Sequence, residues 1–307
     1  MVYSITAISR EHTMRVFVTG ATGFIGSAVV RDLIDAGHEV VGLTRSDAGA
    51  AALTAAGAEA HHGTLEDLDS LRAGAAATDG VIHTAFIHDF SDYAAAAETD
   101  RRAIEAIGEV LAGSERPLVV ASGMAVPTPG RLATEEDGVD PNSPRASEQT
   151  ALPLASRGVR ASVLRLPPSV HGKGDHGFVP HLISTARAKG FSAYPGDGSN
   201  RWPAVHRLDA ARLFRLALEN APAGARLHAV GDEGIPVRDI AEVIGRHLGL
   251  PVNSIAVEQA FDHFGFIGGI LAMDIAASST LTQRQLDWHP AQTGLIADLE
   301  EGHYFKD

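Results

Sequence analysis

Short, continuously apolar runs alternate with longer Ala- and Leu-rich stretches between Met14 and about residue 166. Runs of this kind are typical of parallel strands buried on both faces, and the longer stretches between them read as helices. The predicted strands are 15–20, 39–45, 80–86, 117–123 and 161–166. The predicted helices are 24–37, 46–57, 65–76 and 91–113. This alternation predicts an α/β fold with a doubly wound parallel sheet and right-handed crossovers.

Beyond residue 166 the alternation loosens. Residues that break regular structure predict a loop at Pro167, Pro168, Gly172, Gly174 and Gly177, and a second loop is expected at 194–203. Helices are expected at 208–220, 237–249 and near the C-terminus. We therefore expect an N-terminal extension (1–13), a domain built on the parallel sheet (14–166) and a smaller lobe. The lobe is formed mainly by 167–307, and segments such as 225–231 return to the main sheet.

Composition narrows the range of partners. The formal net charge of −13 argues against nucleic acid and against an anionic membrane surface, since both require a basic face. The chain has no cysteine, so disulfides, thiolate nucleophiles and cysteine-bound metals are excluded. No apolar run reaches the roughly 18 residues of a membrane span, and the first 13 residues lack the apolar core of a signal peptide. We expect a cytoplasmic protein.

Three glycines, Gly20, Gly23 and Gly26, stand between the first predicted strand and the first predicted helix. In this position they allow a tight turn, close approach of the backbone to a pyrophosphate, and close packing of helix on strand. The pattern predicts a Rossmann-type fold that binds a dinucleotide. The second strand ends in Thr44, Arg45 and Ser46, where an acidic residue would favour NAD. Because a guanidinium pairs with a 2′-phosphate, NADP is expected rather than NAD.

From Met14 to about Tyr304 the chain resembles the extended and atypical short-chain dehydrogenases/reductases, the NAD-dependent epimerase/dehydratase group. The resemblance is carried by TGATGFIG (19–26), GTLEDLDSL (63–71), VIHTA (81–85), LRLPPSVHGKG (164–174) and the segment 196–219. The cofactor-binding residues that it implies, together with those of the glycine turn and the second strand, are Gly20, Thr22, Gly23, Phe24, Ile25, Gly26, Thr44, Arg45, Ser46, Thr64, Leu65, Thr84, Ala85, Phe86, Ala121, Ser122, Pro167, Pro168 and Val170.

The catalytic residues of that family are only partly matched. The family uses an Asn, a Ser or Thr, and a Tyr-x-x-x-Lys pair in which the Lys lowers the pKa of the Tyr and holds the ribose. The tyrosines are Tyr3, Tyr93, Tyr194 and Tyr304, and none has Lys four residues later. Alignment places Asp140 and Pro144 at the Tyr and Lys positions, with Arg145 as a candidate to reach the ribose. Ser122 or Gly123 takes the Ser position, and Asp100 the Asn position.

Other groups could replace the missing acid. The catalytic candidates are Ser122, Asp100, His88 and His171, because histidine titrates near neutrality and serves as acid or base. The expected substrate pocket contains His88, Gly123, Met124, His176, Tyr194, Trp202 and His206. No metal is expected, since the five-residue spacing of His171, His176 and His181 does not place them on one helical face.

These features predict an NADP-dependent oxidoreductase that acts on a carbonyl or alcohol carbon of a small molecule. Two alternatives stay open: a sugar-nucleotide epimerase or dehydratase, and a non-enzymatic NADP sensor that regulates a partner. The protein is expected to be a monomer or a homodimer. The family often dimerises through the helices that match 92–113 and 145–157, but Pro153 is expected to kink or shorten the second of these.

Overall fold

The computed structural model describes residues 13–306 except 89–91, 125–127, 129 and 140–144. Its main feature is a seven-stranded sheet with the order β10-β6-β5-β4-β1-β2-β3, in which every neighbouring pair is parallel. The strands are β1 (Arg15–Thr19), β2 (Glu39–Thr44), β3 (Glu59–His62), β4 (Gly80–His83), β5 (Pro117–Gly123), β6 (Arg160–Leu166) and β10 (Arg226–His228). The predicted doubly wound α/β fold is confirmed.

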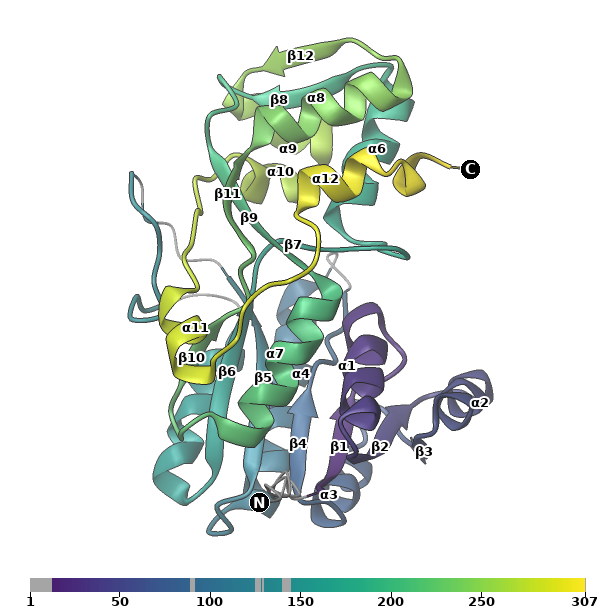
Figure 1. Cartoon of the computed structure of the whole chain (residues 1–307), viewed down its shortest axis with the longest axis vertical. Coiled ribbons are helices and arrows are strands. Elements are labelled where there is room, and N and C mark those ends of the chain that lie inside the picture. The colour runs from purple at the N-terminus through teal and green to yellow at the C-terminus, as the bar shows by residue number, and fades with distance from the viewer. Residues whose placement is uncertain (1–12, 89–91, 125–127, 129, 140–144, 307) are drawn as a thin grey trace, which may run out of the picture.

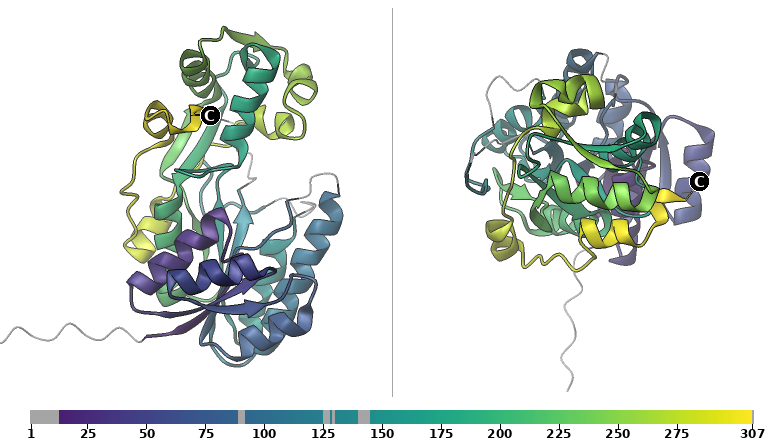
Figure 2. Two further views of the ribbon diagram at one scale, coloured as in Figure 1. Left: turned by 90° about the vertical axis from the view of Figure 1, so that its right-hand side faces the viewer. Right: turned by 90° about the horizontal axis from the view of Figure 1, so that it is seen from above.

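Helices cover both faces of this sheet (Figures 1 and 2). One face carries α1 (Phe24–Asp35), α2 (Asp47–Ala56) and α7 (Arg207–Asn220), and their apolar side chains pack on the sheet in one core. The other face carries α3 (Leu68–Ala76), α4 (Tyr93–Leu111), α5 (Ser147–Ala151) and the 3-10 helix η1 (Leu152–Arg157), which enclose a second core. The buried strands therefore have apolar side chains on both sides, as their continuous hydrophobic pattern requires.

A smaller lobe stands on the carboxyl ends of these strands (Figure 1) and has a hydrophobic core of its own. Its strands are β7 (Ser169–His171), β8 (Ser192–Pro195), β9 (Arg201–His206), β11 (Asp232–Pro236) and β12 (Val252–Ile255). Its helices are α6 (Phe178–Lys189), α8 (Val237–Leu248), η2 (Val257–Gln259), α9 (Ala260–Phe264), α10 (Ile267–Leu271), α12 (Leu295–Glu300) and η3 (His303–Phe305), while α11 (Thr280–Leu286) lies beside β10. Among the described helices none is long and apolar enough to cross a membrane.

The smaller lobe differs from the sequence prediction because it contains strands where loops were expected. β7 lies within the expected loop at 167–177, and β8 and β9 enter the loop expected at 194–203. β9 pairs with β7 and β11, and β8 pairs with β12. These strands are short and their partners come from distant parts of the chain, so no local hydrophobic pattern predicts them. The division at residue 166 stays a prediction.

Pro153 acts as expected on the helix that contains it. The α-helical part α5 ends at Ala151, and the chain continues as the 3-10 helix η1 with the proline in its first turn. Proline has no backbone N–H and its ring excludes the carbonyl of the preceding turn, so the longer helix cannot continue. The segment expected as one helix, 145–157, is therefore two short ones.

Candidate active site

The turn between β1 and α1 is shaped by glycine. Gly20 has φ of +69°, in the left-handed region, and a Cβ there would lie 2.8 Å from both the Ala85 nitrogen and the Thr84 hydroxyl. A Cβ on Gly26 would lie 2.0 Å from the Gly20 carbonyl oxygen. Gly23 caps α1 without any side-chain hydrogen bond, and the first turn of α1 contains no acidic residue. The N–H groups at this helix end are thus available to an anion such as a diphosphate.

Two side chains from the second half of the chain reach the same turn. The His176 ring meets the Phe24 ring edge-on at 5.8 Å, and the Arg207 guanidinium carbon lies 5.0 Å from the centre of the Phe24 ring. Arg207 is the first residue of α7, and it forms no ion pair with any residue that the structure describes. A positive charge therefore lies beside the turn between β1 and α1, although the chain as a whole is strongly acidic.

The end of β2 is where the sequence predicts the adenosine half of a dinucleotide. Thr44 is buried, and its hydroxyl donates to the Ser46 carbonyl oxygen at 3.3 Å. The Ser46 hydroxyl accepts from the Gly49 N–H at 3.1 Å and so caps α2. Between them Arg45 is exposed, and within the described part of the chain it has no acidic partner. Thr64, after β3, accepts the N–H groups of two following residues and orders the adjoining turn.

The opposite end of the site contains a second arginine. Arg145 donates through Nε to the Ser147 hydroxyl at 3.0 Å and through Nη2 to the Ala121 carbonyl at 3.2 Å. Its guanidinium carbon lies 4.2 Å from the centre of the Phe86 ring. A Cβ on Gly123 would be 3.9 Å from Arg145 Nη1. The guanidinium therefore lies at the carboxyl end of β5, where the nicotinamide half is expected.

Asp100 lies behind this arginine and not at the surface of the site. Its side chain is 1% exposed, with one oxygen 3.1 Å from His83 Nε2 and the other accepting from the Ser147 hydroxyl at 2.5 Å. His83 Nδ1 is 2.9 Å from the Thr19 hydroxyl. Burial tends to raise the pKa of Asp100, but the His83 hydrogen bond and the nearby charges prevail and lower it. Asp100 is thus a buried carboxylate that supports other residues.

Two titratable groups flank Phe86. The His88 ring meets the Phe86 ring at 5.5 Å, and burial together with the Arg145 charge lowers the pKa of His88. The Tyr93 ring lies 5.7 Å from the same ring, and burial raises the pKa of Tyr93 although Arg145 opposes the shift. At neutral pH the histidine is therefore neutral and the phenol is protonated. Of the pair that alignment suggested, Asp140 and Pro144, both residues lie outside the described part of the chain.

The structure brings many of the candidates together, but not all. Gly20, Gly26, Thr84 and Ala85 meet at the turn, and Phe86, Ala121 and Gly123 meet around Arg145. Ser122 is buried at the end of β5, as is Pro167 just after β6, and Pro168 and Val170 follow. Thr22, Gly23, Phe24 and Ile25 occupy the turn and the first residues of α1, and Leu65 is buried in the turn after β3.

Four of the expected site residues lie elsewhere or are enclosed. His171 is fully buried, with Nδ1 2.7 Å from an Asp298 oxygen, and so has no surface to offer a substrate. Trp202 is also fully buried and stacks on Phe178 in the core of the smaller lobe. Tyr194 lies on β8 in the two-stranded sheet at the far end of that lobe. Met124 is buried in a small apolar cluster.

His206 and His181 also form hydrogen bonds within the protein. His206 caps α7 by accepting the Leu208 N–H at 3.3 Å, and His181 Nε2 lies 2.9 Å from the Phe264 carbonyl oxygen. His171, His176 and His181 thus have different partners. Sequence reasoning missed the roles of His83 and Ser147. A histidine inside the buried run GVIH was the available signal, because a buried polar side chain requires a partner.

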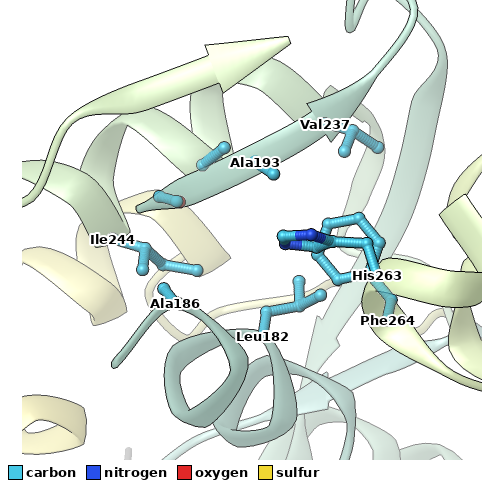
Figure 3. A pocket seen from close by; sticks show the side chains of 9 residues that line it. Leu182, Ala186, Ala193, Val237, Ile244, His263 and Phe264 are labelled. Carbon is cyan, nitrogen blue, oxygen red and sulfur yellow. The ribbon is translucent and has the colours of Figure 1, made fainter. Parts of the chain in front are cut away.

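A small cavity in the smaller lobe is separate from this site (Figure 3). It has a volume of about 10 Å³ and lies between α6, β8, α8 and α9. The His263 imidazole points into it, among apolar side chains that include Leu182 and Val237. Such a volume holds about one water molecule, so the cavity is a packing void and not a substrate pocket.

A parallel sheet whose first strand leads through a glycine turn into a helix without a side-chain cap defines a Rossmann-type dinucleotide-binding protein. The model of the NAD dependent epimerase/dehydratase family matches residues 16–230. The chain therefore belongs to the NAD-dependent epimerase/dehydratase family, and it is an NAD(P)-dependent enzyme of that family. The resemblance noted in the sequence is confirmed.

The chain is similar to several individual proteins. An uncharacterized protein of Schizosaccharomyces pombe is 57% identical over 295 residues, which cover 95% of this chain and 100% of that protein. A 4-hydroxy-2-methyl-3-oxo-4-farnesyl-3,4-dihydroquinoline-1-oxide ketoreductase of Stigmatella aurantiaca is 32% identical, covering 69% of this chain and 66% of the ketoreductase. The crystal structure of a dTDP-glucose 4,6-dehydratase from Streptomyces venezuelae has a TM-score of 0.77 at 22% identity, covering 95% and 97% of the two chains. That structural likeness concerns the fold.

Proposed function

We propose that this enzyme is an NADP-dependent oxidoreductase that transfers hydride between C4 of the nicotinamide and a carbonyl or alcohol carbon of a small molecule. The observation that carries the proposal is a cation at each end of the proposed dinucleotide site. Arg45 directly follows β2, and Arg145 lies at the carboxyl end of β5. Arg45 suits a 2′-phosphate, because a guanidinium binds phosphate oxygens through paired hydrogen bonds. The ketoreductase of Stigmatella aurantiaca and a 2′-dehydrokanamycin reductase of Streptomyces kanamyceticus, 29% identical, support reduction of a carbonyl.

Two arginines of the smaller lobe are engaged by other groups of the protein, which argues against a nucleoside diphosphate sugar as substrate. Arg201 is held by two hydrogen bonds of 2.9 Å to the Asp274 carboxylate, and Arg187 donates to the Phe305 carbonyl. A second diphosphate would need such groups to be available. A small, uncharged ketone needs only a donor for its oxygen and a proton source, and the protonated Tyr93 and the neutral His88 both lie near Arg145.

The proposed function is tested by mixing the purified protein with NADPH and following the absorbance of the reduced nicotinamide. The probes are phenanthrenequinone, a 3-oxo acid ester and an oxidised aminoglycoside, with dTDP-glucose and UDP-glucose as sugar-nucleotide controls. We expect turnover of at least one carbonyl probe and none of the sugar nucleotides. Epimerisation and dehydration consume no reduced nicotinamide overall, so the sugar nucleotides are also incubated with the oxidised cofactors and their products are separated by chromatography. Conversion of a sugar nucleotide would favour the epimerase or dehydratase alternative. Tight NADPH binding without turnover of any probe would favour the sensor alternative.

The cofactor preference depends on Arg45. We expect NADPH to bind about tenfold or more tightly than NADH, and Arg45→Ala to remove most of that difference by weakening NADPH alone. The lost interaction is a charge-assisted hydrogen bond to the 2′-phosphate, which NADH does not have. Calorimetric titration of both cofactors measures the effect. Arg31→Ala, which removes an exposed arginine on α1, serves as the control and should change neither affinity. Equal affinities of the unaltered protein for NADPH and NADH would contradict the role of Arg45.

A further inference from the structure

The order of the strands indicates which part of a dinucleotide lies near Arg145. β5 is separated from β1 by β4, and β2 and β3 lie on the other side of β1. Neighbouring strands are about 4.8 Å apart, so the end of β5 is roughly 10 Å from the glycine turn. With the diphosphate at the turn and the adenosine above β2, the second nucleoside must extend over β4 and β5. Arg145 is therefore placed beside the nicotinamide ribose and not beside the diphosphate.

Arg145 has N–H groups that the described contacts do not use. A guanidinium carries five N–H groups, and the described contacts use Nε for Ser147 and one Nη2 hydrogen for the Ala121 carbonyl. Among the described residues no carboxylate lies within ion-pair distance of it, and the side chain is half-buried. Nη1 lies on the side of Gly123, whose missing side chain leaves room there. These remaining N–H groups can donate to hydroxyl oxygens.

We infer that Arg145 holds the nicotinamide ribose in this enzyme, taking over the task for which the chain has no Tyr-x-x-x-Lys pair. The inference rests on the proposed function, because it assumes that a nicotinamide dinucleotide occupies the site. Arg145 donates hydrogen bonds to the ribose hydroxyls and fixes the nicotinamide ring against the end of β5. Its charge lies close to Tyr93 and His88, on which proton transfer would depend.

A chain of buried hydrogen bonds holds Arg145 in place. Ser147 accepts from Arg145 and donates its own hydrogen to Asp100, so its orientation is fixed by both neighbours. Asp100 is in turn held by His83, which reaches the Thr19 hydroxyl at the end of β1. The carboxylate balances the arginine charge through a single hydroxyl, and a buried carboxylate is tolerated only with such partners. Asp100 and Ser147 are thus positioning residues, and Arg145 is the group that contacts the cofactor.

The test needs no substrate, because it measures binding of NADPH to the purified protein. Arg145→Met is expected to weaken NADPH binding by about 10- to 100-fold, and Arg145→Lys by less, since one donor and the charge are kept. Asp100→Asn and Ser147→Ala are expected to weaken it by about three- to tenfold, because Arg145 loses its orientation. Arg157→Met, at an exposed arginine of η1, is the matched control and should bind NADPH normally.

The fragment 2′,5′-ADP separates this role from a general defect. It contains the adenosine half and the 2′-phosphate but lacks the nicotinamide ribose, so the Arg145 variants should bind it like the unaltered protein. Arg45→Ala should weaken both ligands. If Arg145→Met and Arg145→Lys both bind NADPH with unchanged affinity, the inference is wrong. If they lose 2′,5′-ADP and NADPH equally while the thermal midpoint is unchanged, Arg145 does not act on the ribose. Failure of the unaltered protein to bind NADPH would instead refute the proposed function.

Discussion

Gly26→Ala is expected to weaken the binding of NADPH and NADH by about 100-fold or more, a larger effect than that of replacing either arginine of the cofactor site. The added Cβ would lie 2.0 Å from the Gly20 carbonyl oxygen and 2.7 Å from its carbonyl carbon. Both are backbone atoms, so either the turn or α1 must move. The N–H groups that converge on the diphosphate would then no longer share one binding site. Calorimetric titration with both cofactors measures the loss.

Two further glycines provide graded controls for this prediction. Gly23→Ala places its Cβ 3.2 Å from the Gly20 carbonyl oxygen and should have a smaller effect. Gly269→Ala adds a methyl group where no atom lies within 4 Å and should leave binding unchanged. If Gly26→Ala folds and binds NADPH as tightly as Gly269→Ala does, the turn between β1 and α1 is not the diphosphate site.

Glu148→Ala is expected to lower the free energy of unfolding by about 3–5 kcal/mol. The carboxylate of Glu148 accepts two hydrogen bonds of 2.8 Å from Arg165 and one of 2.8 Å from Arg226. Arg165 is fully buried on β6, between β5 and β10. Without Glu148 its charge stays in the interior with only the His228 ring, 3.1 Å from Nη1, as a polar neighbour in the described contacts. Unfolding in urea measures the loss.

An exposed pair gives the contrast for this experiment. Arg72 bridges Glu109 at 3.1 Å, and the two side chains are 39% and 53% exposed. Glu109→Ala should therefore cost less than about 1 kcal/mol, because water solvates both partners. Similar losses for Glu148→Ala and Glu109→Ala would show that the buried network does not stabilise the protein.

The same network predicts how stability depends on pH. Burial tends to raise the pKa of Glu148, but pairing with Arg165 and Arg226 prevails and lowers it below the usual 4.5. A carboxylate with a lowered pKa contributes stability above its unfolded pKa, and the contribution is lost as the pH falls through the folded pKa. The difference in unfolding free energy between the unaltered protein and Glu148→Gln should therefore be constant well above the usual pKa of 4.5 and shrink in stronger acid.

The glycine turn between β1 and α1 could be predicted from the sequence because each requirement for it is local. Three glycines at fixed spacing, an apolar run before them and a helical stretch after them all lie within residues 15–35. The parallel sheet was predictable for a related reason, since strands buried on both faces are continuously apolar. Arg45 was predicted to contact the cofactor because it directly follows such a strand, and that role stays a prediction. In these cases neighbouring residues in the chain are also neighbours in the fold.

The sequence by itself determined the parallel sheet, the glycine turn and the family, because their signals are periodic or closely spaced. Only the tertiary structure decided which polar side chains meet. Asp100 and Ser147 are 47 positions apart, and His171 and Asp298 are 127 apart. Such contacts depend on the order of the strands and the packing of helices upon them, which no local pattern records. For the same reason Trp202 and His171, which read as site residues in a loop, are enclosed in the folded protein, while Arg145 comes to the end of β5.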